Sequence, residues 1–358
     1  MLFFIGTEFG NISGGVLFMN VTEQVLELLQ QGSGPISGEE MAERLKVSRN
    51  AVWKAVKKLK EDGYKIGART NCGYELLSES NVLNPANIRR MLTKAASCVA
   101  IDVRSSVSST NTVLKEIAEQ GGAEGMVLIA EQQTMGKGRL GRSFYSPKGD
   151  GLYLSILLRP QFSAEESLSI TTAAAVSVAG AVEAVTGERA LIKWVNDVYL
   201  RGRKICGILT EASVDFETKG LHYAVLGIGV NILEPEGGYS EQLRDVAGAL
   251  YHRDDAPAGV RIRLAAEILN RFFSFYNALP ERSFMEEYKQ RSLLTGMEIT
   301  YLRGESVQEG RVLGVDDEAR LIVQRGDGET QLFSAGEVNI KKDFLDRLRS
   351  QPKERGAK

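Results

Sequence analysis

Residues 125–158 read GMVLIAEQQTMGKGRLGRSFYSPKGDGLYLSILL, and the segment after their glycine-rich centre decides the class of fold. The centre, GKGRLGRS at 136–143, matches the dinucleotide fingerprint G-x-G-x-x-G and comes within one residue of a P-loop. Both motifs need a helix directly after the glycines, because the helix N-terminus binds the phosphate. Here Pro147, Gly149 and Gly151 disfavour a helix, and the apolar run that follows is typical of a strand. The sequence therefore predicts a glycine-rich loop between two strands, which argues against both familiar nucleotide-binding folds.

The loop itself has the composition of an anion-binding segment. Its glycines let backbone amides approach an anion closely, and Lys137, Arg139 and Arg142 add positive charge. We expect it to bind a phosphate or a carboxylate. Taken alone, the stretch also allows a glycine-rich surface hairpin with solvated charges.

The overall composition is that of a soluble protein with more than one domain. A length of 358 residues predicts two or three domains, and a net charge of -2 disfavours a protein that coats nucleic acid over its whole surface. Cys72, Cys98 and Cys206 form no C-x-x-C pair, so neither a disulfide framework nor a zinc ribbon is indicated, and a reducing cytoplasm is expected. Residues 1–18 suit neither a signal peptide nor a membrane span, and we expect a disordered or wrongly started extension before Met19.

Residues 19–80 predict a small winged helix-turn-helix domain. The apolar spacing in NVTEQVLELLQQG (20–32) predicts one helix, and ISGEEMAERLKVSRNAVWKAVKKLKEDG (36–63) predicts two more, joined by a tight turn. Ser37 with Glu40 predicts a capping box, and Ser48 is expected to cap the third helix. Alternation after Gly63 predicts a β-hairpin with Asn71 near its turn.

The charge of this domain points to DNA. Between Lys46 and Arg69 there are eight basic and two acidic residues, the local imbalance that a phosphate backbone requires. The second helix of such a pair presents its first residues to base edges. The candidate DNA-binding residues are Ser37, Ser48, Arg49, Asn50, Lys54 and Lys57. A solvated basic face in an interaction module is the alternative.

Three further segments place polar residues at the ends of predicted elements. SSTNTVLKEIA (108–118) offers hydroxyls and an amide at the start of an amphipathic helix. IKWVNDVYLRGRKICGILTE (192–211) carries a polar turn after an apolar strand and a lysine before a buried run. AVLGIGVNI (224–232) is typical of a buried strand, interrupted here by two glycines.

Together with the glycine-rich loop, these segments resemble the biotin protein ligases. The resemblance rests on Ser109-Thr110-Asn111, Gln133, and the stretches 136–142, 193–197, 203–207 and 227–231. With the basic winged helix in front, the chain is similar to the bifunctional form that also represses the biotin operon. The implied fold is α+β: the winged helix at 19–80, a central mixed α/β domain of the biotin/lipoate ligase type at 81–292, a small SH3-like β-barrel at 293–345 and a polar tail at 346–358.

The resemblance implies an ATP- and Mg²⁺-dependent, AMP-forming ligase that makes biotinyl-5′-adenylate and transfers biotin to a lysine of the biotin carboxyl carrier protein of acetyl-CoA carboxylase. Operator DNA and a ligand-promoted homodimer are the other implied partners, and no membrane is expected. The implied catalytic residues are Lys204, Arg139 and Lys193; the biotin-binding residues are Ser109, Thr110, Asn111, Gln133, Lys137, Gly138, Arg139 and Lys204; the nucleotide-binding residues are Gly136, Arg142, Phe144, Asn196 and Asn231; Asp197 is the candidate metal ligand.

Three positions depart from the family pattern. Lys137 stands where the family often has arginine, Val195 where it usually has proline, and Phe144 where tryptophan is common. Trp194 is expected to be a core residue, and holding a turn is the alternative role for Asn196 and Asp197. Two other functions stay open: a DNA-binding biotin sensor without ligase activity, and a ligase of the lipoate type.

Overall fold

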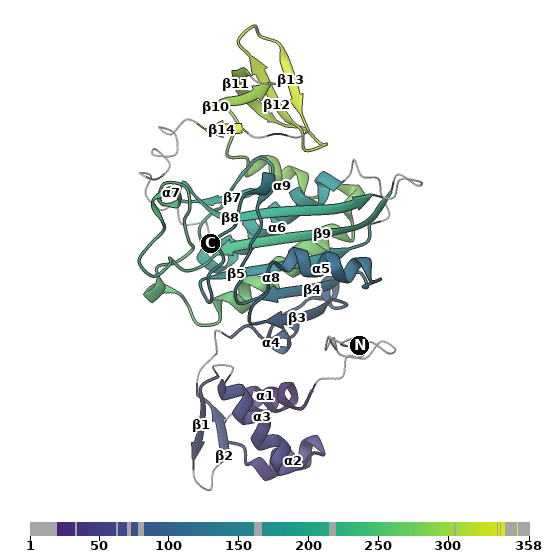
Figure 1. Ribbon diagram of the computed structural model, residues 1–358, viewed down its shortest axis with the longest axis vertical. Coiled ribbons are helices and arrows are strands. Elements are labelled where there is room, and N and C mark those ends of the chain that lie inside the picture. The colour runs from purple at the N-terminus through teal and green to yellow at the C-terminus, as the bar shows by residue number, and fades with distance from the viewer. Residues whose placement is uncertain are drawn as a thin grey trace, which may run out of the picture. The chain divides into compact units, whose positions relative to one another are not determined.

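The chain divides into two compact units, residues 1–87 and 88–358. The computed structural model describes residues 20–32, 34–61, 64–69, 73–77, 82–160, 167–214, 220–303, 306–334, 336, 338–340 and 349 (Figure 1). The predicted extension 1–18, Met19, Asn71 and the predicted tail apart from Arg349 lie outside the described residues.

Three helices and a hairpin form the first unit, in the predicted order: α1 (Val21–Gln31), α2 (Gly38–Leu45), α3 (Arg49–Glu61), and the antiparallel strands β1 (Ile66–Arg69) and β2 (Gly73–Leu76). A capping box, which the sequence analysis missed, joins Asn20 and Glu23 at the start of α1. At α2, Ser37 Oγ accepts a hydrogen bond from Glu40 N at 3.0 Å, but the Glu40 carboxylate pairs with Arg44. The predicted capping box is therefore present in its Ser37 half.

One core holds this unit together. Val25, Leu26, Met41, Val52 and Leu59 are buried where the three helices meet. Because apolar residues of α3 recur at helical spacing, its basic side chains stay on the opposite, exposed face. The helix-turn-helix and hairpin predicted from the sequence are confirmed.

A seven-stranded mixed sheet forms the centre of the second unit, in the order β3-β4-β5-β9-β8-β7-β6. Among the neighbouring strands that the structure describes in this sheet, β3 and β4 are parallel and all other pairs are antiparallel. The glycine-rich loop joins β4 and β5, which are antiparallel neighbours, so the prediction of a strand after the loop is confirmed. The strands are β3 (Ala100–Arg104), β4 (Met126–Ala130), β5 (Gly151–Leu158), β6 (Leu191–Lys193), β7 (Asp197–Leu200), β8 (Arg203–Val214) and β9 (Leu221–Asn231).

Helices cover both faces of this sheet (Figure 1). Thr171 of α6 (Ser167–Thr186) hydrogen-bonds Thr210 of β8, whereas Asn111 of α5 (Thr110–Glu119) hydrogen-bonds Glu211, the next residue of β8. Since successive side chains of a strand point to opposite faces, α5 and α6 lie on opposite sides. The long helix α8 (Val260–Tyr276) packs beside α6. The shorter elements are α4 (Pro85–Arg89), η1 (Lys94–Ala96), η2 (Arg139–Gly141), α7 (Glu241–Arg244), η4 (Arg253–Asp255), η5 (Leu279–Glu281) and α9 (Met285–Gln290).

Helix α6 is apolar on all sides. By length and composition its stretch Leu168–Thr186 could cross a membrane, but 72% of that stretch is buried inside the unit. A helix buried all round needs no polar face, so its composition is that of a core helix.

The last strands that the structure describes form a five-stranded antiparallel sheet with the order β13-β12-β11-β10-β14. Trp194 Nε1 donates a hydrogen bond to Ala319 O at 2.8 Å, in the turn before β12. Trp194 is only 5% exposed, which confirms it as a core residue. The strands are β10 (Glu298–Arg303), β11 (Ser306–Val315), β12 (Leu321–Arg325), β13 (Thr330–Phe333) and β14 (Val338–Ile340).

Candidate active site

Glycines of two neighbouring strands create a hollow on the α5 face of the central sheet. Gly227 of β9 lies in register with Ser155 of β5 and with Leu209 of β8. Two residues further along β9, Gly229 lies in register with Gly207 of β8. Because residues two apart share a face, the missing side chains leave space on one side of the sheet.

Two side chains occupy part of that space. A Cβ at Gly227 would lie 2.2 Å from Asn111 Oδ1, and a Cβ at Gly229 would lie 2.6 Å from the Phe144 ring. Any larger residue at either position would therefore displace the start of α5 or the end of the glycine-rich loop.

A cavity of about 300 Å³ opens above this hollow. All of the predicted substrate-binding residues line it except Gly136. Gly136 lies beneath the loop instead: its carbonyl accepts from Phe144 N at 2.8 Å, and a Cβ there would meet Phe144 O at 2.4 Å. Its position is therefore one that shapes the loop.

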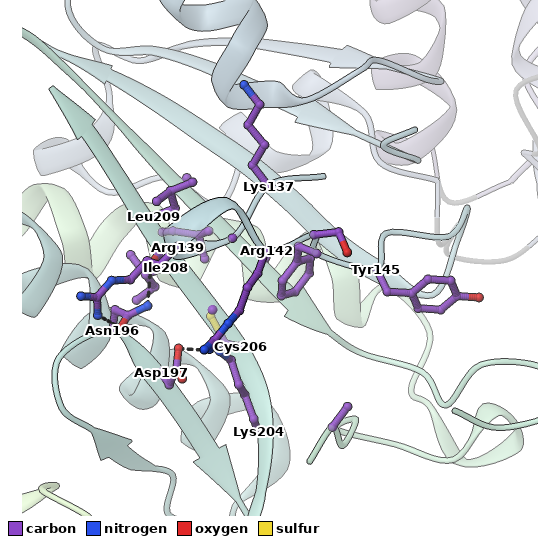
Figure 2. Close-up of a pocket in the computed structure, with 18 of the residues that line it drawn as sticks. Lys137, Arg139, Arg142, Tyr145, Asn196, Asp197, Lys204, Cys206, Ile208 and Leu209 are labelled. Atoms are coloured by element: carbon purple, nitrogen blue, oxygen red, sulfur yellow. Dashed lines mark hydrogen bonds and ion pairs between the residues drawn. The ribbon is translucent and has the colours of Figure 1, made fainter. Parts of the chain in front are cut away.

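One wall of the cavity is cationic. Arg139 Nη1 donates to Asn196 Oδ1 at 2.7 Å, and Asn196 Nδ2 donates to Ile208 O at 2.9 Å, so the asparagine holds the arginine against β8 (Figure 2). Beside them, Lys204 Nζ pairs with Asp197 Oδ1 at 2.6 Å. The peptide bond between Trp194 and Val195, just before this group, is cis.

Lys137 lines the same cavity but points elsewhere. Figure 2 shows its side chain directed away from the Arg139–Asn196 contact and from the Lys204–Asp197 pair. Its charge acts on Glu211 and contributes to lowering the pKa of that carboxyl. Lys137 and Arg139 of the loop therefore point in different directions (Figure 2).

The opposite wall is neutral and tied together by hydrogen bonds. Thr110 donates twice to Gln133 Oε1, from its N at 2.8 Å and its Oγ1 at 3.0 Å. Gln133 Nε2 donates to Ser146 Oγ at 3.0 Å, and Ser146 Oγ donates to Phe144 O at 3.0 Å. The start of α5 is thereby connected to the end of the glycine-rich loop.

Two residues that hydrogen-bond to this wall, Ser155 and Glu211, were missed by sequence reasoning. Ser155 is fully buried, with its Oγ 2.7 Å from Thr110 Oγ1 and 2.6 Å from Asn111 Oδ1. Glu211 accepts from Asn111 Nδ2 at 2.9 Å and from Lys115 Nζ at 2.8 Å. A single serine in the apolar strand 151–158 and a carboxylate ending the run ICGILTE were the available signals.

The remaining predicted residues lie as follows. Asn231 Nδ2 donates to Gly248 O at 3.0 Å, which fixes its amide at the cavity edge. The Phe144 ring lies over Gly229, so the predicted stacking on adenine stays a prediction. In the described part of the chain no group of three or more His, Cys, Asp and Glu side chains could hold a metal ion, so Asp197 belongs to no such group.

A second candidate site is the exposed face of α3 in the first unit. Arg49, Asn50, Lys54 and Lys57 are all exposed, as expected of DNA-binding residues. Sequence reasoning missed Trp53, which is 52% exposed on the same face and has Lys57 Nζ 5.7 Å from its ring centroid. Ser37 and Ser48 use their hydroxyls as helix caps.

Comparison with protein families gives three matches. Residues 103–231 match the Biotin/lipoate A/B protein ligase family, residues 21–75 match an HTH domain, and residues 296–340 match the Biotin protein ligase C terminal domain. The matches follow the order of the helix-turn-helix unit, the cavity and the C-terminal sheet.

Curated relatives and solved structures agree with these matches. The bifunctional ligase/repressor BirA of Bacillus spizizenii is 31% identical over 87% of this chain and 97% of its own length. A biotin–[acetyl-CoA-carboxylase] ligase of Mycobacterium tuberculosis is 35% identical over 66% of this chain and 88% of its own. The biotin protein ligase of Aquifex aeolicus in complex with biotin and ATP is similar with a TM-score of 0.56 and 27% identity, covering 67% of this chain and 98% of that one.

Proposed function

This chain belongs to the family of bifunctional biotin ligase/repressors, and on that premise we propose how its residues divide the work. It is a biotin protein ligase with a helix-turn-helix repressor domain.

The reaction has two steps. First, a carboxylate oxygen of biotin attacks the α-phosphorus of ATP, and pyrophosphate leaves. Then a lysine amine of the biotin carboxyl carrier protein of acetyl-CoA carboxylase attacks the acyl carbon of biotinyl-adenylate, an amide forms, and AMP leaves. Both steps gather negative charge on oxygen, which fixed donors stabilise best when they are already in place.

One observation carries this proposal: a single cavity joins a neutral hydrogen-bonding wall to a cationic wall. Ser109, Thr110 and Gln133 suit the uncharged polar ring of biotin, because hydroxyls and amides can both donate and accept. Arg139 and Lys204 suit the carboxylate and the reacting phosphate. Both are cations, and Asn196 and Asp197 hold their charged groups in place.

The proposed nucleotide side consists of Lys193, Arg142, Phe144 and Asn231, with Mg²⁺ bound mainly by phosphates. Mg²⁺ usually keeps several waters and takes one or two carboxylates plus substrate phosphates. Asp197 fits such a site as a single ligand, although its Oδ1 is already paired with Lys204. The metal would supply charge neutralisation at the phosphates.

The regulatory half of the proposal assigns operator DNA to α3. Arg49, Asn50 and Lys54 would reach bases and phosphates, and Trp53 adds an apolar surface suited to a thymine methyl group. Ligand binding would favour a homodimer that presents two such helices, with a coupling of about 1–3 kcal/mol. The cytoplasm is the proposed location.

A single incubation tests the ligase half. The full chain is mixed with biotin, MgATP and a biotin carrier domain, and the carrier is followed by mass while pyrophosphate is assayed. We expect pyrophosphate and a carrier heavier by one biotinyl group. Tight biotin binding without pyrophosphate would instead identify a sensor, and faster turnover of lipoate than of biotin would identify a lipoate ligase.

A further inference from the structure

Around Ser155, the residues of the neutral wall have fewer hydrogen-bond donors than acceptors. Ser155 Oγ lies 2.7 Å from Thr110 Oγ1 and 2.6 Å from Asn111 Oδ1, but a hydroxyl carries one proton. The Thr110 hydroxyl proton already goes to Gln133 Oε1, so Thr110 cannot supply the second one. Among the side chains that the structure describes, no other donor reaches either acceptor, so one acceptor stays unfilled on two residues that line the cavity.

This surplus depends on which end of the Asn111 amide faces Ser155. Asn111 Nδ2 donates to Glu211 Oε2 at 2.9 Å and to Leu209 O at 3.3 Å. An ionised carboxylate only accepts hydrogen bonds, so a flipped amide would set its oxygen against two oxygens. Glu211 therefore holds Asn111 Oδ1 toward Ser155, on a residue that lines the cavity.

The other oxygen of Glu211 is held from outside the cavity. Lys115 Nζ pairs with Glu211 Oε1 at 2.8 Å, and the Glu211 side chain is 25% exposed. An ammonium is a donor only, so Lys115 keeps one carboxylate oxygen and leaves the second for Asn111.

We propose that Glu211 is a positioning residue for ligand choice: by fixing the Asn111 amide, it makes the wall demand a ligand that brings an N–H donor. The inference rests on the proposed function, because biotin has ureido N–H groups and the lipoate ring has none. A site built around a hydrogen bond rejects a ligand that lacks it, because a buried polar group is then left unpaired.

The test is Glu211→Gln in the full chain. Lys115 needs an acceptor, so the introduced glutamine would give its amide oxygen to Lys115 and present its amide nitrogen to Asn111. A flipped Asn111 amide would accept from the glutamine, at the cost of the weaker 3.3 Å contact with Leu209 O, and would turn an N–H toward Ser155 and away from Glu211. We expect the KM for biotin to rise about 10- to 100-fold, with the KM for ATP and kcat changed less than about threefold. The preference for biotin over lipoate, measured by pyrophosphate release, should fall at least about tenfold.

Two further variants separate positioning from simple loss of an ion pair. Lys115→Met removes the same ion pair but keeps the Glu211–Asn111 hydrogen bond, so the KM for biotin should stay within about threefold. The double variant N111D/E211Q restores an acceptor toward Ser155, because the introduced glutamine amide can donate to the introduced aspartate. The KM for biotin of N111D/E211Q should be at least about tenfold lower than that of E211Q. This double variant decides the case even if E211Q is unstable.

The outcomes divide clearly. If E211Q keeps the biotin KM and selectivity of wild type, if it raises the KM for ATP as much as the KM for biotin, or if N111D/E211Q recovers nothing, the inference is overturned. If wild type releases no pyrophosphate with biotin, the proposed function fails first and takes this inference with it.

Discussion

Replacing Lys204 by methionine should nearly abolish adenylate formation while leaving the fold intact. Lys204 Nζ lies 2.6 Å from Asp197 Oδ1, and these side chains are 30% and 17% exposed. At an effective dielectric of about 20, two unit charges about 4 Å apart attract by about 4 kcal/mol, an upper bound for what the lysine can exert on a phosphate at that distance. Loss of one transition-state donor typically lowers kcat about 10²–10³-fold, or about 3–4 kcal/mol.

The variant has a second consequence, which gives the test its control. Without Lys204, the Asp197 carboxylate would be left unpaired at a site that we propose binds two anions, and its repulsion would add to the loss. The double variant K204M/D197N removes that repulsion and should regain at most about tenfold. Lys289→Met removes an ion pair of the same 2.6 Å length, with Asp317, outside the cavity, and should keep turnover within about twofold.

The assay is biotin-dependent pyrophosphate release with thermal unfolding measured in parallel. If K204M/D197N regained wild-type turnover, Lys204 would serve only to neutralise Asp197, and its assignment to the reacting phosphate would be refuted. Near-normal turnover of K204M would refute it as well.

Three more outcomes are expected. Trp53→Ala should weaken operator binding about tenfold in a gel-shift assay with ligation unchanged, because the ring is exposed on α3; equal loss of both activities would contradict this. Gly229→Val should lower adenylate formation at least about tenfold and destabilise the fold by about 1–3 kcal/mol, because a Cβ at position 229 would lie 2.6 Å from the Phe144 ring. Gly326→Ala is the control: a Cβ there has no atom within 4 Å, so neither activity nor stability should change. Burial raises the pKa of the Glu211 carboxyl, but hydrogen bonds from Lys115 and Asn111 and the charge of Lys137 bring it below its ordinary value of 4.5. The carboxylate is therefore ionised at pH values above 4.5. The KM for biotin should be constant from neutral pH down to about pH 4.5 and should rise only below that pH.

The first unit could be predicted almost entirely from local signals. Ser37 and Ser48 cap their helices, and the basic residues of α3 are exposed, because caps and amphipathic faces depend on neighbours within a few positions. The same reasoning missed Trp53, because polar and basic residues, and not an aromatic one, were expected on the DNA-binding face.

Sequence reasoning predicted the residues that line the candidate active site but missed the hydrogen-bond partners that hold them. Ser109 to Asn111, Gln133 and Lys204 were singled out, and they do line one cavity. Ser155 and Glu211 were not, because their importance lies in strand register: Ser155 lies beside Gly227, and Glu211 faces α5 while Thr210 faces α6. A residue's partner across a sheet cannot be read from its own neighbours in sequence.

By itself, the sequence determined that the glycine-rich stretch 136–143 joins two strands, because Pro147 and the glycines after it exclude a helix. It also determined which side chains bring charge and hydroxyls to the site. Tertiary structure decided where they point: Lys137 away from the Lys204–Asp197 pair, Arg139 onto Asn196, and the Asn111 amide between Glu211 and Ser155. The physical reason is that hydrogen-bond direction is set by partners from β5, β8 and α5, which are distant in the chain and meet only when the sheet forms.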